Sequence, residues 1–344
     1  MKSRRDALRT IGAGGAILGG TALGFGVGIN PLAAARSVKI TQAVTALAFI
    51  QNYVAQSQGF FKEEGLDAEL VDTRGGGPDV QMVLAGRAEF TTNDGAQVLP
   101  ALQKGQRLTC VLGLLNRSII NVTMRKQTAD RLGIKESSPF ADKVAALGGL
   151  KIGVTRPGAL TWQLARANLT NAGMDPDSGA SIIGVGGASA LAAALENGDI
   201  DVMYISVPIG DRVVARGKAI TLIDNSRGED PNIPRFLMEG LWVVPEFLEQ
   251  EPDTVARAVR ALHRASRFIV ENPAERTAEA VGHVFGAIDR PVLVEGCSKV
   301  KAAVSADGKV SAEELRFTMD VLRTNGFLEQ EFTLVDVFDG RFLT

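Results

Sequence analysis

An alternation of short apolar strands with helices runs twice along this chain and constrains its fold more than any other feature. In the first run we expect strands at 38–42, 67–72, 88–91, 108–114 and 119–124, with helices at 48–61, 79–85 and 95–104. In the second run we expect strands at 150–154, 181–185, 200–204 and 219–223, with helices at 161–172, 189–196 and 207–216. Strands that alternate with helices predict βαβ units and a mainly parallel sheet. The pattern therefore predicts an α/β protein with two similar units.

The rest of the chain is predicted to return to the first unit and then to be helical. The apolar run 237–244 fits a strand, and helices are expected at 252–270, 273–284, 291–304 and 311–325. Pro252, Pro273 and Pro291 each stand where a first helical turn begins, which is a favourable position for proline. We expect a first lobe from 36–124 and 237–344, including a helical C-terminal tail, and a second lobe from 125–236 inserted into it.

The first 35 residues have the pattern of an export signal. Arg4 and Arg5 precede a mildly apolar run at 11–29, and small residues follow at 33–35. A basic start, an apolar centre and a small-residue cleavage site are typical of a secretory signal, and adjacent arginines indicate the twin-arginine route. A membrane anchor is the alternative, but the run is glycine-rich and barely reaches the roughly 20 residues that a span needs. We expect cleavage after Ala35 and a periplasmic protein.

Composition excludes some classes of protein. The formal net charge is −2, and a mildly acidic chain gives no indication of nucleic-acid binding. Plentiful alanine and glycine with only 6% aromatic residues suit close packing of helices on a sheet. Cys110 and Cys297 are the two cysteines, and we expect two separate buried thiols, although an oxidising compartment would permit a bridge.

Three segments carry a resemblance to a known family. Residues 55–66 read A-Q-S-Q-G-F-F-K-E-E-G-L, which is similar to the family pattern A-x-x-x-G-F-F-x-x-E-G-L. Residues 84–91 place a glycine between a helix and a strand, and 147–154 read L-G-G-L-K-I-G-V, similar to the opening of the family's second lobe. The chain thus resembles the solute-binding proteins of ABC importers, in particular the nitrate/sulfonate/taurine family, which includes thiamine-precursor binders.

The resemblance implies a fold and a function. The implied fold is the two-lobed periplasmic-binding-protein fold of type II, with a ligand cleft between lobes that close around the ligand. The implied partners are a small-molecule ligand and an ABC permease in the membrane, and we expect a monomer without cofactor or metal.

The carboxyl ends of the predicted strands suggest where a ligand would bind. In open α/β sheets, ligands bind outside these ends, and the rule selects the loops at 45–48, 75–77, 92–96 and 155–161, as the resemblance also does. Loops after two further second-lobe strands add candidates. The predicted ligand-binding residues are Thr45, Ala46, Leu47, Gly75, Gly76, Gly77, Asn93, Asp94, Thr155, Arg156, Gly158, Thr161, Gly186, Tyr204 and Ser206.

These loops favour a small organic anion of the sulfonate or carboxylate class. Each selected loop opens a helix, whose free N–H groups and dipole favour negative charge. Thr155 and Thr161 would add hydroxyls, and Arg156 positive charge. The carboxylate of Asp94 would repel a bare small anion and would instead suit a polar or amino end of the ligand. Structural alternatives stay open, since a glycine run also forms tight turns, Thr161 also fits a helix N-cap and Arg156 also fits a surface ion pair.

One apparent calcium motif is rejected. Residues 307–314 resemble the later part of an EF-hand loop, but Ala303 and Ser305 stand where the first acidic ligands would be needed. Ser311 and Glu314 instead predict a capping box at the start of a helix.

The residues predict a binding protein rather than an enzyme. Catalysis would need a nucleophile–base pair or a metal cluster, whereas His263 and His283 fall on predicted tail helices away from the loops. The alternatives are a binding protein of an ion-driven importer, and a thiamine-precursor-type binder or enzyme on the same fold.

Overall fold

The first sheet is built from both ends of the chain. The structure is a computed structural model that describes residues 35–74, 77–233 and 235–343, so the predicted export signal, Gly75 and Gly76 lie outside the described residues. The strand order is β2-β1-β3-β10-β4, with β1 parallel to β2 and β3, and β10 antiparallel to β3 and β4. These strands are β1 (Arg36–Gln42), β2 (Leu66–Asp72), β3 (Phe90–Asn93), β4 (Thr109–Leu115) and β10 (Glu239–Val243).

The second sheet repeats this order with the middle of the chain. Its order is β7-β6-β8-β5-β9, with β6 parallel to β7 and β8, and β5 antiparallel to β8 and β9. The strands are β5 (Ile120–Arg125), β6 (Lys151–Val154), β7 (Ser181–Gly184), β8 (Val202–Ser206) and β9 (Ala219–Ile223). Each sheet is therefore mainly parallel, as predicted. Each sheet contains one antiparallel strand. In the second sheet this strand is β5, which follows β4 of the first sheet along the chain, and in the first sheet it is β10, which follows β9 of the second.

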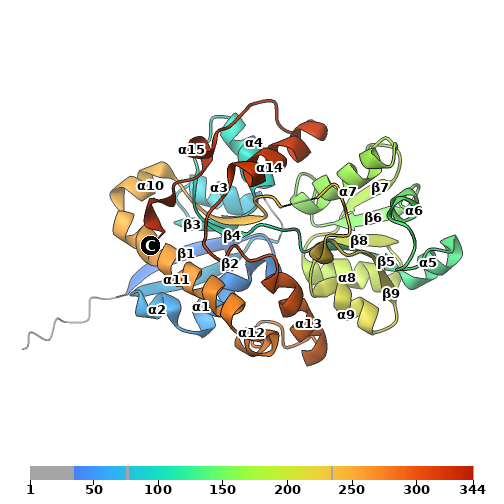
Figure 1. Cartoon of the computed structure of the whole chain (residues 1–344), viewed down its shortest axis with the longest axis horizontal. Coiled ribbons are helices and arrows are strands. Elements are labelled where there is room, and N and C mark those ends of the chain that lie inside the picture. Colours follow the sequence, from blue (N-terminus) through green and yellow to red (C-terminus); the bar gives the residue numbers. More distant parts are fainter. Residues whose placement is uncertain (1–34, 75–76, 234, 344) are drawn as a thin grey trace, which may run out of the picture. The chain divides into compact units, whose positions relative to one another are not determined.

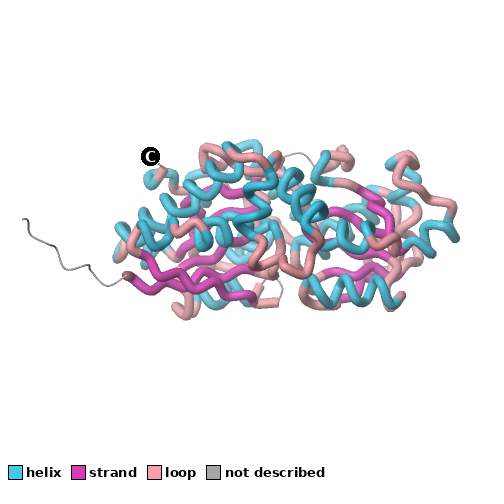
Figure 2. The backbone as a smooth tube through the Cα atoms, turned by 90° about the horizontal axis from the view of Figure 1, so that it is seen from below, coloured by secondary structure: helices cyan, strands magenta, loops and turns pink. Residues whose placement is uncertain are grey.

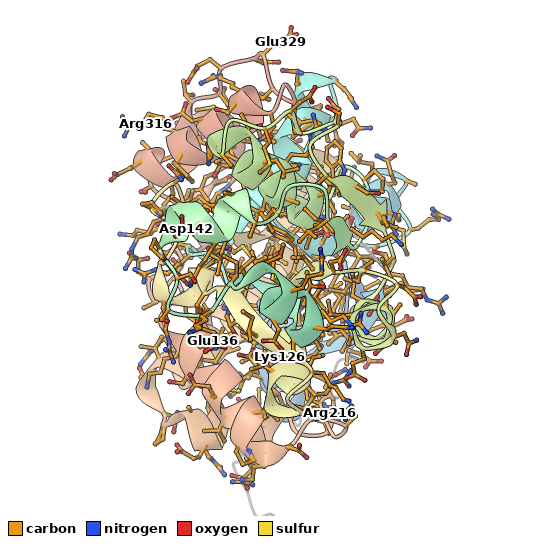
Figure 3. The ribbon with its side chains drawn as sticks, turned by 90° about the vertical axis from the view of Figure 1, so that its right-hand side faces the viewer. Lys126, Glu136, Asp142, Arg216, Arg316 and Glu329 are labelled. Atoms are coloured by element: carbon orange, nitrogen blue, oxygen red, sulfur yellow. The ribbon has the colours of Figure 1, made fainter. Side chains whose placement is uncertain are left out.

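Helices pack on both sheets, and the strands form two separate groups among them (Figures 1 and 2). The second sheet carries α5 (Lys126–Leu132), α6 (Phe140–Ala145), α7 (Leu160–Asn171), α8 (Ala188–Asn197) and α9 (Ile209–Ala215). Exposed charges such as Lys126, Asp142 and Arg216 come from this helical layer (Figure 3). Helices from before β4 include α1 (Ile50–Ser57), α2 (Phe60–Glu63), α3 (Pro78–Leu84) and α4 (Gly95–Gln103).

The C-terminal helices pack mainly against the first sheet and its helices. Helix α11 (Pro252–Glu271) contacts α1, α2 and β4, and it buries Val255, Val259 and Leu262 at the spacing of one helix face. Helices α12 (Ala274–Val281), α13 (Arg290–Lys301) and α14 (Ala312–Thr324) follow it. Of these, α13 and α14 also contact α9 and α7 of the second sheet, respectively. The remaining short helices are η1 (Leu47–Phe49), η2 (Asn225–Arg227), α10 (Pro245–Gln250), α15 (Leu334–Val337) and η3 (Gly340–Phe342).

Some expected elements differ from the structure. The helix predicted at 48–61 is divided into η1, α1 and α2, and Gly59, with a φ of 76°, interrupts the helix between α1 and α2. The strands predicted at 88–91 and 200–204 each lie two residues later, at Phe90–Asn93 and Val202–Ser206. The two strand errors concern the ends of short elements, where the apolar pattern is weakest.

Several local predictions are confirmed. Ser311 and Glu314 form the capping box of α14, with both reciprocal hydrogen bonds present. Cys110 and Cys297 are buried free thiols, and burial raises the pKa of each to about 12. Within the described ranges, no helix combines the length and apolarity that crossing a membrane requires.

Candidate ligand-binding site

A cavity of about 40 Å³, which we call the inner cavity, is lined by residues at strand ends of both sheets. It lies at the carboxyl ends of β1, β3, β6 and β8, the edge at which α/β sheets bind ligands. The antiparallel strands β5 and β10 begin at the same edge, so they also contribute. The lining residues are Ala43, Val44, Ala48, Phe49, Asp94, Ile120, Thr155, Ala159, Leu160, Thr161, Ile205, Ser206, Met238 and Glu239.

Hydroxyl groups form the polar part of the wall that the second sheet supplies. Thr155 directly follows β6, and Thr161 lies in the first turn of α7. Their Oγ1 atoms are 2.8 Å apart, and the Thr155 N–H donates to Thr161 Oγ1 at 3.2 Å. Ser206 ends β8 and is 5% exposed. Thr155, Thr161 and Ser206 thus bring hydroxyl groups from three separate segments to the wall of the inner cavity.

Carboxyl groups form the polar part of the wall that the first sheet supplies. Asp94 caps α4, where its Oδ1 accepts a hydrogen bond from the Gln97 N–H at 2.7 Å. Glu239 begins β10 and is 3% exposed, and its Oε2 has no hydrogen-bond partner among the described residues. Burial raises the pKa of Asp94 to about 8. Burial, with repulsion from the carboxyls of Asp94 and Asp79, raises the pKa of Glu239 well above its ordinary value. The wall of the inner cavity therefore carries two buried carboxyl groups, and burial favours the protonated form of each.

A third carboxyl stands behind these two. Asp79, in the first turn of α3, is fully buried and accepts hydrogen bonds at Oδ1 from the N–H groups of Gly77 and Val80. Burial raises its pKa as well. Neither lysine nor arginine is among the residues that line the inner cavity. An anionic guest would therefore meet no cationic side chain in this wall.

A larger cavity of about 350 Å³, which we call the outer cavity, has the opposite character. Arg74 and Arg212 line it together with the first turn of α8, which has no side-chain cap. Thr45 also lines it and donates from Oγ1 to Asp72 Oδ2 at 2.8 Å. Asp72 lines the outer cavity as well, so one carboxylate stands beside the two arginines. The other lining residues are Gly187, Ala188, Ser189, Ala190, Ile209, Val284, Phe285, Ala287 and Ile288. Arginines and free helix amides are groups that favour an anion.

Hydrogen bonds also join the segments that follow strands of the first sheet to those that follow strands of the second. Arg156 donates from Nη2 to the carbonyl oxygens of Arg74 at 3.0 Å and Thr73 at 3.4 Å. Gln97 donates to the Gly158 oxygen, and Gln163 donates to the Ala96 oxygen at 3.2 Å. In this structure, therefore, Arg156 spans the two loops rather than lining either cavity.

The structure brings together only part of the predicted set. Asp94, Thr155, Thr161 and Ser206 line the inner cavity, and Thr45 lines the outer one. Tyr204 is fully buried and donates to Asn168 Oδ1 at 2.8 Å, so it points into the packing beneath α7. The remaining predicted residues within the described ranges line neither cavity, namely Ala46, Leu47, Gly77, Asn93, Arg156, Gly158 and Gly186.

Among the polar residues that line the inner cavity, Glu239 is the one that sequence reasoning overlooked. The notable signal was a single carboxyl inside the apolar run 236–244, which otherwise reads F-L-M-G-L-W-V-V. A charged residue in a buried strand is unusual and deserves a functional explanation. Phe49 and Met238, which also line the inner cavity, had no comparable signal because apolar residues abound in both segments.

Solved structures with this fold include periplasmic binding proteins. A Bordetella bronchiseptica protein has a TM-score of 0.77 and 24% identity, with 91% of this chain and 96% of that one covered. The alkanesulfonate-binding protein SsuA from Xanthomonas axonopodis pv. citri, bound to MOPS, has a TM-score of 0.70 and 14% identity, with 90% and 99% covered. The fold is thus the periplasmic-binding-protein fold expected from the sequence.

The sequence comparison places the chain in a family. It belongs to the NMT1/THI5-like family, whose model matches residues 47–276. The Bacillus subtilis protein YtlA, named as a candidate binding protein, is 21% identical over 294 residues, which cover 85% of this chain and 84% of YtlA.

Proposed function

We propose that this protein is the extracytoplasmic solute-binding component of an ABC importer, exported by the twin-arginine route. The observation that carries the proposal is a polar cavity at the carboxyl ends of strands from both sheets, in a chain of the NMT1/THI5-like family. Each sheet with its helices forms one lobe, and the ligand is captured between them. The loaded protein then delivers the ligand to a membrane permease. The role is binding without chemistry, as the names of SsuA and YtlA support.

The ligand in this proposal is a small organic molecule with a sulfonate or carboxylate group. The outer cavity supports this class, because Arg74, Arg212 and the amides that open α8 converge on it. The buried Nε of Arg212 has no hydrogen-bond partner among the described residues and is available to an oxyanion. Arginine pairs with carboxylates and sulfonates through charge-assisted hydrogen bonds.

Isothermal titration of the purified protein with propanesulfonate, benzoate and nitrate tests this proposal. Arg212→Gln is expected to weaken binding of a hit about tenfold, which corresponds to about 1.4 kcal/mol. Arg216→Gln is the matched control, because this arginine at the end of the same helix is exposed and lines neither cavity. Equal affinity in Arg212→Gln and wild type would remove the outer cavity from the site.

The export route has its own test. Replacing Arg4 and Arg5 with lysine in the full-length chain is expected to leave the precursor in the cytoplasm. Normal export of this variant would refute the twin-arginine assignment.

A further inference from the structure

We infer that the inner cavity is a subsite for a protonated nitrogen of the ligand, which hydrogen-bonds to Glu239 and Asp94. The inference rests on the proposed function and makes it more specific, because it adds an amine to the class of molecule that the site accepts. Four observations carry it: an unpartnered oxygen, the charges around it, the size of the cavity and the protonation of the carboxyls.

The first observation is the Glu239 side chain. It lines the cavity, is 3% exposed and has an Oε2 atom without a partner among the described residues. A buried polar atom that makes no hydrogen bond lowers stability relative to a satisfied one, because it has lost its contact with water and gained no partner. A ligand group that donates to this oxygen recovers that free energy. The empty protein therefore presents an acceptor that an N–H donor completes.

The second observation is the charge of the surroundings. The ionisable groups that act on Glu239 are Asp94, before α4, and Asp79, at the start of α3, and both are acidic. A sulfonate or carboxylate placed here would add a negative charge to a site that already disfavours ionisation of its own carboxyls, whereas an ammonium group would favour that ionisation and pair with the carboxylate. The described residues contain no group of three or more His, Cys, Asp or Glu side chains arranged to hold a metal ion. An organic cation is thus the better match.

The third observation is size. A cavity needs on the order of 10–15 Å³ of water-accessible volume to hold one water molecule, so a cavity of about 40 Å³ has room for a small group such as ammonium or methylammonium. The rest of the ligand must lie elsewhere. Val44 lines the inner cavity and the adjacent Thr45 lines the outer cavity, whose volume is about 350 Å³. The two cavities therefore suit the two ends of one molecule.

The fourth observation concerns protons. Burial raises the pKa of Asp94 to about 8 and that of Glu239 well above its ordinary value, so the empty protein favours the protonated form of these carboxyls. When an R–NH₃⁺ group enters, it favours the ionised form of a carboxyl beside it. One carboxylic O–H bond then breaks, its proton leaves to solvent, and the carboxylate pairs with the ammonium. Binding of the amine is thus coupled to release of one proton.

Matched pairs of ligands test the inference by isothermal titration. The probes are 3-aminopropanesulfonate against propanesulfonate, and 4-aminobutyrate against butyrate, each at neutral pH in two buffers of different ionisation enthalpy. We expect the amine to bind at least tenfold more tightly than its partner and to release about one proton. Glu239→Gln should abolish the tenfold preference and the proton release. Glu314→Gln, which alters a buried carboxyl of the α14 capping box that lines neither cavity, should preserve both.

The outcomes separate the two proposals. Equal affinities within each pair would overturn the nitrogen subsite and leave the proposed binding function standing. Tighter binding of the amines without proton release, or with the preference intact in Glu239→Gln, would also overturn the subsite as described. Absence of binding by all four compounds would overturn the proposed ligand class and the inference with it.

Discussion

Replacing Asp94 with asparagine should change how the stability of the protein depends on pH. Burial raises the pKa of Asp94 from its ordinary 3.8 to about 8. Between these values the folded protein keeps a proton that the unfolded chain releases. The free energy of unfolding therefore falls as pH rises, by about 1.4 kcal/mol per pH unit from this one group. Asparagine does not titrate, and it keeps an oxygen that accepts the Gln97 N–H, so the cap of α4 is preserved.

Urea unfolding followed by tryptophan fluorescence measures this effect. Subtracting the free energy of unfolding of wild type from that of Asp94→Asn isolates the contribution of Asp94. This difference should rise by about 3 kcal/mol between about pH 5 and about pH 7, at the slope given above. Glu329→Gln, at an exposed carboxyl labelled in Figure 3, should give a flat difference. A flat difference for Asp94→Asn would refute the reasoning, because it would mean that Asp94 is ionised in the folded protein.

Three further predictions concern packing and polar contacts. Tyr204→Phe should lower stability by about 1 kcal/mol through loss of its hydrogen bond to Asn168, with ligand affinity in titration unchanged; weaker binding would place Tyr204 in the site. Gly113→Ala should lower the free energy of unfolding in urea by about 1–3 kcal/mol, because the added Cβ would lie 2.8 Å from the backbone oxygen of Lys309; an unchanged free energy would contradict this. Lys299→Met should lower the free energy of unfolding by about 3 kcal/mol, because it removes the cation that pairs with largely buried Asp211 and weakens the pairing of Asp224, which keeps Arg227; a neutral change would show that this contact contributes nothing.

Most of the element positions were predictable because they depend on local periodicity. The strand expected at 219–223 is found there, and α11 differs from the helix predicted at 252–270 by one residue. Gly59 shows the limit of such reasoning, because a glycine in an apolar helical pattern is compatible with a continuous helix and with a break. Its left-handed conformation depends on how the chain turns back into β2, which is a tertiary property.

The candidate site was predictable in part for a different reason. Asp94, Thr155, Thr161 and Ser206 follow strands or begin helices, so the rule about carboxyl ends of strands identified them without knowledge of distances. Glu239 escaped this rule because it stands at the start of a strand. It reaches the same edge because β10 runs antiparallel to its neighbours.

The sequence by itself determined the α/β alternation, the two similar units, the helical tail and the capping box of α14, because each depends on residues close together in the chain. Only the tertiary structure decided the character of the two cavities. Asp79, Asp94 and Glu239 come from three separate segments, and their raised pKa values arise from burial and mutual repulsion that exist only after folding. The sequence indicated an anion site mainly from its helix starts, whereas packing places Arg74 and Arg212 at the outer cavity, with Asp72, and places Asp94 and Glu239 at the inner cavity.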